Sequence, residues 1–446
     1  MDLRKKINKY NFVLSIILAL LIGFVLRIYL TRFGNFGDVS VFTEWGARFW
    51  ELDLKEFYYF DDWYYSFPTY PPLSPLMYGG LYWLYEQRYI LSEIHNFIKI
   101  IPSSFIVFFG KTIPKEPFMY SYGYYMLLKI PSILADLGIS VLIFAMIRKI
   151  TSDMRKAFFG MLLYLFNPVT IFLSSVWGQT ESLVAFFGLS AFILLVYGNI
   201  WLSLPLMFIS LFIKPTWMLL VPLFLFLFYK AKKEMKDVAV GVLLVTVIFL
   251  VSTYPFSGSE IVLFAKDTIL GNMLPAAKGT PMASISAFNF HTIFYQIDSV
   301  LASNTFLGIP VNILGILGFV FINLITFKYL SKSKTTTLNR VMFAIFFISF
   351  GGYLFLTNML ERYFFAGFAP LIIIAFIRPK RLSPVVVINL ILFANLVWVF
   401  YRRSVHIVNH LFIDYNFFLI TTLSVIIVAC YVLISYKEVN RISRKK

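Results

Sequence analysis

Long apolar runs recur along the whole chain and restrict its fold more than any other feature. The first follows the basic segment MDLRKKINKY and reaches about Leu30. Runs of this length are typical of helices that cross a bilayer, where the backbone must satisfy its own hydrogen bonds. Of the 446 residues, 59% are hydrophobic and only 14% are charged, which excludes an ordinary soluble domain. The first run lacks a small-residue cleavage site, so we interpret it as an uncleaved span.

Apolar segments predicted to cross the membrane are separated by short connections. They are 11–31, 122–148, 157–175, 182–198, 200–213, 215–229, 237–255, 305–327, 340–357, 364–377, 384–401 and 416–436. Several are shorter than the ~20 residues of a straight span, and 200–213 with 215–229 is interpreted as a broken pair around Pro215. The sequence therefore predicts an all-α, polytopic transmembrane helical bundle of about 12 spans. We expect one integral membrane domain over residues 1–446.

Basic residues gather between the predicted spans. The basic segments are 4–9, 148–156, 230–236, 328–340, 378–381 and 437–446. The positive-inside rule assigns these segments and both termini to the cytoplasm. Orientation against an anionic leaflet accounts for the net charge of +17, so nucleic acid is not an expected partner. The single cysteine, Cys430, excludes a disulfide framework.

Three segments on the opposite, extracytoplasmic side are long or polar: 32–121, 256–304 and 402–415. The first is a large outer loop in which residues 90–101 place apolar side chains at helical spacing, which predicts a helix lying in the interface. Residues 73–85 are predicted to lie on the surface or to re-enter it. A crossing there would move every later basic segment to the other side. The C-terminal spans occupy 380–446.

Polar residues stand at the outer ends of several predicted spans. Asp38 follows the first span, Lys214 lies at the tip of the broken pair, and Arg362 lies in the turn after 340–357. Further candidates for substrate contacts in these turns and loops are Glu44, Asp62, Tyr70, Trp177, Gln179, Glu181, Asn289, His291, Glu361 and Tyr363. A charge at membrane depth is costly and is usually paired, water-exposed or functional. Their gathering on one side predicts a shared outward-facing cavity.

These residue types suit the transfer of a sugar from a lipid phosphate. An ionised Asp38 could take the proton of an acceptor hydroxyl as that hydroxyl attacks an anomeric carbon. Lys214 and Arg362 would stabilise the charge that accumulates on a departing phosphate. Aromatic faces such as that of Tyr70 could stack on sugar rings.

Each candidate also has a structural interpretation. Asp38 could be a solvated acid near a helix N-cap, and Glu44 could simply face water. Lys214 could be a lysine that snorkels to the interface. Glu361 and Arg362 could form a plain salt bridge that holds their turn.

Other polar residues are predicted to be structural. Lys129 and Asp136, seven residues apart, would lie on one helix face as a buried pair or contact Arg27. His406 and His410 stand one helical turn apart, but the sequence shows no third ligand, so we predict no metal site. No cofactor is expected, and a divalent metal is not favoured.

Six stretches, in order over residues 40–370, resemble the GT-C class of polytopic glycosyltransferases, and most of all its mannosyltransferase branch. They are GDVSVFTEWGARFW, YPPLSPLMYG, NPVTIFLSSVWGQTESL, FIKPTW, SISAFNFHTIFY and ERYFFAGFAPL. The resemblance implies a GT-C fold whose large first outer loop carries juxtamembrane helices and whose site faces away from the cytoplasm. It also implies that Asp38 is the general base of an inverting single displacement. Some members hold a metal at an acidic pair after the first span, whereas here only Asp38 follows it directly.

The expected donor is a polyprenyl-phosphate hexose, with mannose the leading candidate. The expected acceptor is a glycolipid, a glycan or a protein, and the location is the cell membrane of a prokaryote or the endoplasmic reticulum of a eukaryote. Two rival functions are a flippase for lipid-linked oligosaccharides and an O-antigen-type ligase. A transporter normally shows internal repeats around a midplane site, and this sequence shows no repeat.

Overall fold

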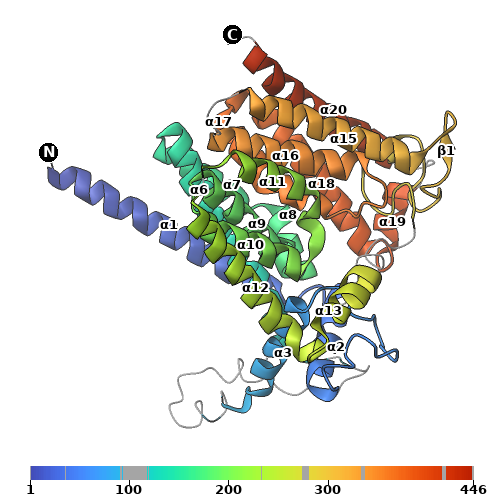
Figure 1. Ribbon diagram of the computed structural model, residues 1–446. Coiled ribbons are helices and arrows are strands. Elements are labelled where there is room, and N and C mark those ends of the chain that lie inside the picture. Colours follow the sequence, from blue (N-terminus) through green and yellow to red (C-terminus); the bar gives the residue numbers. More distant parts are fainter. Residues whose placement is uncertain are drawn as a thin grey trace.

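The computed structural model describes most of the chain, and its gaps fall in connections and at the ends. The described residues are 2–35, 37–90, 93, 118, 120–232, 234–273, 281–332, 337–413 and 418–443. Helices dominate this part (Figure 1). Its only sheet is a short antiparallel hairpin of β1 (Thr305–Phe306) and β2 (Ile309–Pro310). The predicted all-α class is confirmed, and the expected interfacial helix at 90–101 lies outside the described residues.

Eight described helical segments are long and apolar enough to cross a membrane, as expected of a polytopic membrane protein. They contain α1 (Asp2–Leu30), α6 (Tyr122–Thr151), α7 (Met154–Leu165) with α8 (Pro168–Ile171) and η1 (Phe172–Trp177), α12 (Met235–Ser257), α15 (Val311–Ser331), α16 (Leu338–Phe355), η6 (Pro379–Arg381) with α18 (Leu382–Tyr401), and α20 (Phe418–Ser443). Shorter apolar helices lie between them. These are α9 (Glu181–Val196), α10 (Ile200–Ile213), η2 (Pro215–Leu220) with α11 (Val221–Lys230), and η5 (Tyr363–Gly367) with α17 (Phe368–Ile377).

One predicted span begins later than expected. Residues 305–310 form the β1–β2 hairpin, and α15 starts only at Val311. Leu307 and Gly308 both have positive φ, 51° and 80°, which builds the turn of this hairpin and cannot continue a helix. The apolar character of 305–310 therefore does not extend the membrane-crossing helix.

The first loop, residues 32–121, adds two helices outside the spans. They are α2 (Asp38–Glu51) and α3 (Leu73–Glu86), which pack against each other and against the start of α6. Their shared core is aromatic and includes Phe42, Trp45, Tyr78 and Tyr124. Residues 73–85 lie in α3, whose 14 residues are too few to cross a bilayer, in line with the predicted surface or re-entrant element.

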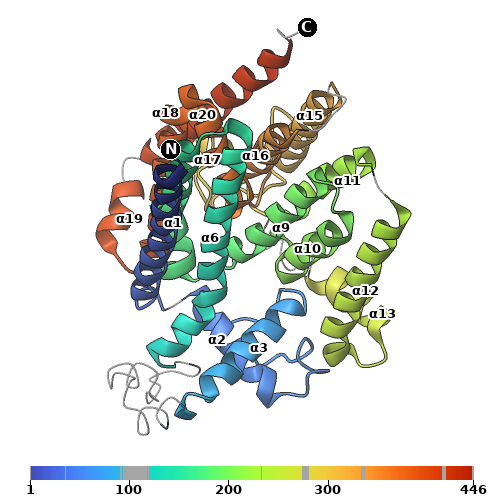
Figure 2. The same cartoon turned by 90° about the vertical axis from the view of Figure 1, so that its left-hand side faces the viewer.

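Figures 1 and 2 place α2, α3 and α13 (Ile261–Phe264) together at one end of the bundle. Both termini lie toward the other end in these views. The second loop also contains η3 (Ala265–Met273) and η4 (His291–Ile293), and α19 (His406–Ile413) follows α18. Helices of the two long loops, 32–121 and 256–304, therefore lie at the end of the bundle where α1 is followed by α2.

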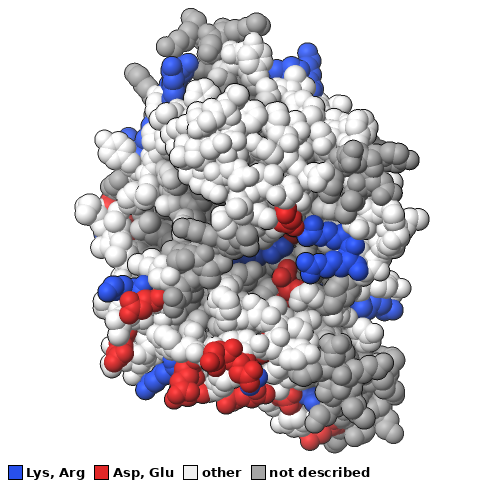
Figure 3. Space-filling view, turned by 90° about the vertical axis from the view of Figure 1, so that its right-hand side faces the viewer, with Lys and Arg blue, Asp and Glu red and all other residues white. Residues whose placement is uncertain are grey.

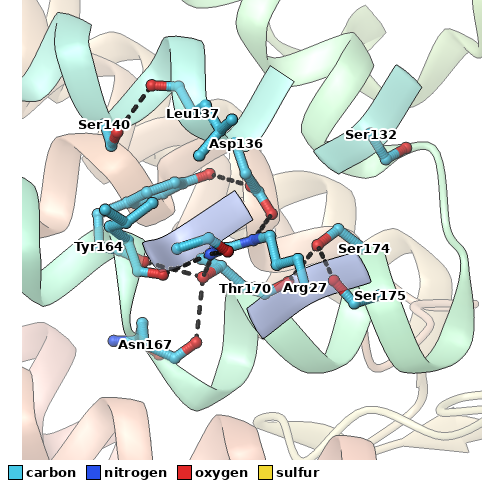
Figure 4. A network of polar contacts seen from close by, with 12 residues as sticks. Arg27, Ser132, Asp136, Leu137, Ser140, Tyr164, Asn167, Thr170, Ser174 and Ser175 are labelled. Atoms are coloured by element: carbon cyan, nitrogen blue, oxygen red, sulfur yellow. Dashed lines mark hydrogen bonds and ion pairs between the residues drawn. The ribbon is translucent and has the colours of Figure 1, made fainter. Parts of the chain in front are cut away.

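A buried polar network connects four helices, α1, α6, α7 and α8, inside the bundle (Figure 4). The Nε atom of Arg27 on α1 lies 3.3 Å from Oδ2 of Asp136 on α6, and both side chains are fully buried. Arg27 also donates to the carbonyl of Leu165 at 2.6 Å and to Oγ1 of Thr170 at 3.1 Å. The hydroxyl of Tyr164 donates to Oδ1 of Asp136 at 2.9 Å. The sequence named Arg27 as one candidate partner of Asp136, and the structure shows that contact.

Candidate active site

Asp38 is the first residue of α2 and lies just beyond the end of α1. The preceding Gly37 has a φ of 69°, a conformation that glycine adopts readily and that redirects the chain between the two helices. The Asp38 side chain is 37% exposed, so one side of its carboxylate faces outward. Its Oδ2 atom accepts a hydrogen bond from Nε2 of Gln179 and lies 3.6 Å from Nη2 of Arg362. Asp38 therefore contacts Gln179 and Arg362 on its buried side, and its other side is open to solvent.

Gln179 and Glu181 come from the tight turn between η1 and α9. Gly178 closes η1 with a φ of 77°, and a Cβ atom there would lie 2.6 Å from Cγ2 of Val39. The absence of a side chain at Gly178 thus lets this turn approach α2 closely. The turn is held by two hydrogen bonds: the amide of Gln179 donates to the Leu173 carbonyl at 2.8 Å, and Ser132 donates to the Gln179 carbonyl at 2.7 Å. Both Gln179 and Glu181 are buried.

Lys214 stands at the break between α10 and η2, as the broken-pair interpretation predicted. Its backbone is extended, and Pro215 then starts η2. Its Nζ atom lies 2.5 Å from Oε1 of Glu181, 3.4 Å from Oε1 of Gln179, and 5.1 Å from the ring centroid of Tyr70. Burial disfavours the charged form, but the Glu181 carboxylate, with smaller contributions from Tyr70 and Tyr363, outweighs it, so the pKa of Lys214 is raised. The contact with Glu181 therefore favours the charged form of Lys214.

Arg362 comes from the connection between α16 and η5 and reaches three carboxylates with different nitrogen atoms. Nη1 lies 2.6 Å from Oε1 of Glu361, Nε lies 3.4 Å from Oε1 of Glu181, and Nη2 faces Asp38. The guanidinium also lies 5.5 Å from the ring centroid of Trp177. Arg362 thus connects the start of α2 and the start of α9 with its own connection between α16 and η5.

Five ionisable groups form this charged cluster: Asp38, Glu181, Glu361, Lys214 and Arg362. Glu361 also accepts a hydrogen bond from Ser286 in the second loop. In Figure 3, charged side chains of both signs gather around a hollow in the middle of one face.

A small cavity of about 10 Å³ borders this cluster and is lined by Glu181, Arg362 and Tyr363, together with residues of η2 and η5. It has room for about one water molecule. A substrate would therefore approach from the exposed side of Asp38 and displace existing contacts.

Two of the predicted substrate residues in the first loop have other contacts. Glu44 is fully buried and accepts hydrogen bonds from the backbone amides of Tyr64 at 2.6 Å and Tyr65 at 2.8 Å. Its carboxylate anchors the loop, because two backbone donors would otherwise lack this partner. Asp62 is exposed, and its carbonyl accepts a long contact of 3.4 Å from Arg48. The structure therefore brings neither carboxylate into the charged cluster.

Asn289 and His291 fold their own segment of the second loop. Oδ1 of Asn289 accepts hydrogen bonds from the amides of His291 at 3.1 Å and Thr292 at 3.3 Å. Nε2 of His291 lies 2.8 Å from the Phe355 carbonyl at the end of α16. Burial lowers the pKa of His291, which keeps the ring neutral. These contacts give both residues a structural role beside the charged cluster.

His406 and His410 contact each other, with 3.0 Å between their Nε2 atoms. Across the described residues, no group of three or more His, Cys, Asp or Glu side chains has the arrangement of a metal site. The charged cluster mixes its carboxylates with cations, and each of its three carboxylates contacts Arg362.

Three side chains that support the cluster were missed by the sequence analysis. Ser286 was one serine among several in its motif, and Ser132 stands in the middle of an apolar segment. Lys129 was assigned to a buried pair, yet it contacts the segments beside Asp38 and Gln179. Their partners are backbone or side-chain atoms far away in the chain, and no sequence pattern signals such contacts.

Residues from four separate parts of the chain thus build a buried ion network with one accessible carboxylate. Asp38, Gln179, Lys214 and Arg362 meet there, as do Trp177, Glu181, Glu361 and, beneath Lys214, Tyr70. Models of known protein families were compared with this chain and none matches it, and no curated protein matches it either.

Proposed function

We propose that this chain is a membrane glycosyltransferase of the GT-C type. It moves a hexose, with mannose the leading candidate, from a polyprenyl phosphate to a hydroxyl of a glycolipid, glycan or protein. In this proposal the eight long helices and the four shorter apolar ones all cross the membrane. Both termini are cytoplasmic, and the charged cluster faces the other side.

The observation that carries the proposal is the convergence of Asp38, Lys214 and Arg362. They are separated by more than a hundred residues each, yet Gln179 and Glu181 connect them within hydrogen-bond or ion-pair distance. A general base and two phosphate-binding cations are the groups that sugar transfer from a lipid phosphate requires. At the edge of the network, the partly exposed Asp38 carboxylate leaves one side open to an acceptor hydroxyl.

The chemistry follows from the positions of these groups. The acceptor hydroxyl approaches the exposed side of Asp38, which takes its proton as the oxygen attacks the anomeric carbon. The bond from that carbon to the phosphate oxygen breaks on the opposite face, so the configuration inverts. Lys214 and Arg362 stabilise the negative charge on the departing polyprenyl phosphate. The proton ends on Asp38, and no cofactor is required.

Donor binding must rearrange the resting network. Both cations already contact Glu181, and Arg362 also contacts Glu361. A phosphate that enters the site competes with these carboxylates for the same donors. We therefore expect the partners of Arg362 to change when the donor binds, since each of its three nitrogen atoms lies near a carboxylate in the resting network.

The test is transfer by the purified protein in lipid nanodiscs with a panel of radiolabelled polyprenyl-phosphate hexoses and acceptors, with and without chelator. Asp38→Asn should reduce transfer by about 10²–10⁴-fold while leaving donor binding intact. Asp62→Asn, which alters an exposed carboxylate of the same loop, is the matched control. Normal transfer by Asp38→Asn would refute the assignment of the base.

The rival functions give different outcomes in the same preparation. A flippase would move lipid-linked sugars across a vesicle membrane without changing their covalent structure. An O-antigen-type ligase would transfer from a diphosphate-linked glycan and leave the monophosphate hexoses untouched. Sugar transfer from the monophosphate donors, without transfer from diphosphate-linked glycans, supports the proposal.

A further inference from the structure

Lys129 on α6 is a fully buried lysine, and among the residues that the structure describes its ammonium contacts only oxygen atoms that carry no formal charge. Its Nζ atom lies 2.9 Å from the carbonyls of Thr31 and Phe33, 3.1 Å from Oδ1 of Asn35, and 3.0 Å from the carbonyl of Val176. An ammonium has three protons to donate, so this arrangement uses all of them. Burying a cation without a carboxylate is costly, and a methionine would pack there without that cost.

The four oxygen atoms belong to two segments only. Thr31, Phe33 and Asn35 lie in the connection that leads from α1 to Asp38. Val176 lies in the last turn of η1, three residues before Gln179. The lysine therefore bonds to both segments that meet at the contact between Asp38 and Gln179: the one that leads to Asp38 and the one that leads to Gln179.

The same face of α6 makes a second attachment. Ser132, three residues after Lys129 and one helical turn away, donates to the Gln179 carbonyl at 2.7 Å. Gly178 packs on the lysine stem, since a Cβ atom there would lie 3.0 Å from Cε of Lys129. The η1–α9 turn is thus held on α6 from both of its ends.

We propose that Lys129 is a positioning residue that sets the geometry between the base Asp38 and its partner Gln179. We call the bonds from Lys129 to these two segments the clamp. The effect of the clamp on catalysis rests on the proposed function, whereas the existence of the clamp does not. The helices already have their own polar connection through Arg27, which joins α1 to α6 and α7. Within the described part of the chain, Lys129 by contrast bonds only to the connection after α1 and to the end of η1.

Hydrogen exchange by mass spectrometry tests the clamp directly. In Lys129→Met, the amides of Phe33 and Gln179 should exchange about tenfold faster or more, because the segments that carry them lose their common anchor. Ser140→Ala removes a hydroxyl from the same helix that bonds only within that helix, to the Leu137 carbonyl, and serves as control. Unchanged exchange at both amides, or an equal increase throughout the bundle, would overturn the proposal.

Chemical rescue separates positioning from general packing. Lys129→Ala leaves room for a small amine, so propylamine should restore kcat at least partly, while the donor KM stays near that of the unmodified protein. Lys129→Met fills the same space without a donor and should not respond. Rescue of both variants, or of neither, would overturn the positioning role. If the unmodified protein transfers no sugar, the proposed function fails, and the exchange experiment still decides whether the clamp exists.

Discussion

The ammonium of Lys214 lies 2.5 Å from Oε1 of Glu181, and each of these side chains is only 3% exposed. The same oxygen atom is 3.4 Å from Nε of Arg362, so one buried carboxylate oxygen serves two cations from separate connections. Glu181 therefore holds together the break after α10 and the turn before η5.

Glu181→Gln should strongly destabilise the fold, because Lys214 then remains buried without its carboxylate. Breaking a buried ion pair on one side costs about 3–5 kcal/mol. Unfolding of the purified protein in detergent would measure the loss, and adding Lys214→Met should recover part of it. Glu260→Gln, at the exposed residue that precedes α13, is the control and should change the free energy of unfolding little. Equal effects of the two substitutions would contradict the central role of Glu181.

Arg362→Lys should lower transfer by about tenfold or more, although the charge is kept. Arginine presents several donors in a planar fork, and here three different nitrogen atoms face three carboxylates. A lysine ammonium cannot make the same contacts from one point. Steady-state kinetics with the donor would measure the effect. Arg402→Lys, whose partner Asp298 lies 3.8 Å away near the surface, should retain full activity.

Glu44→Gln should weaken the first loop and spare the chemistry. Its carboxylate accepts two backbone hydrogen bonds, and the glutamine has one acceptor oxygen, so one buried donor loses its partner at a cost of about 1–3 kcal/mol. Thermal unfolding should show the loss, while transfer below the unfolding temperature should stay near normal. A selective loss of kcat in a stable variant would instead support the substrate-binding role that the sequence suggested.

The Arg27–Asp136 pair should respond differently to single and double replacement. Arg27→Leu alone leaves the buried Asp136 carboxylate unpaired and should cost about 3–5 kcal/mol. Replacing both residues by leucine removes the uncompensated charge, so the double variant should be clearly more stable than the single one. Denaturant unfolding of Arg27→Leu, Asp136→Leu and the double variant gives the coupling between the two side chains. Additive losses would show that the pair does not interact energetically.

His291 should make the stability of the protein depend on pH in mildly acidic solution. Burial lowers its pKa below the ordinary 6.5, so the unfolded chain takes up a proton at a pH at which the folded chain does not. The contribution of neutral His291 to the free energy of unfolding is therefore fully present above about pH 6.5, and it is lost as the pH drops below that value. Unfolding temperatures measured across this range should decline more steeply for the unmodified protein than for His291→Gln. His406→Gln, an exposed histidine, should keep the steep decline.

Much of the architecture could be predicted because hydrophobicity is a local property of the chain. Every apolar segment predicted to cross the membrane overlaps an apolar helix of the described residues, and the break at Pro215 follows from the missing amide of proline. The start of α15 was predicted too early, since residues 305–310 are apolar in a hairpin as well as in a helix. Apolar composition alone does not distinguish the two.

The candidate site was predictable only as a set of polar residues at helix ends. Asp38, Gln179, Lys214 and Arg362 were selected as polar residues at the outer ends of predicted spans, within stretches that resemble a known class of enzymes, and that reasoning says nothing about partners. Glu44 and Asp62 satisfied the same criterion, yet one anchors a loop and the other is exposed.

By itself, the sequence determined the helical class, the apolar segments and the polar residues at their ends, because each depends on neighbours along the chain. Only the tertiary structure decided which of those residues meet. Asp38 meets Gln179 where Gly178 lets the chain approach closely, and beside this contact the buried Lys129 bonds to carbonyls from distant segments. Such contacts are set by how the helices pack in three dimensions, and backbone carbonyls carry no mark of their partners in the sequence.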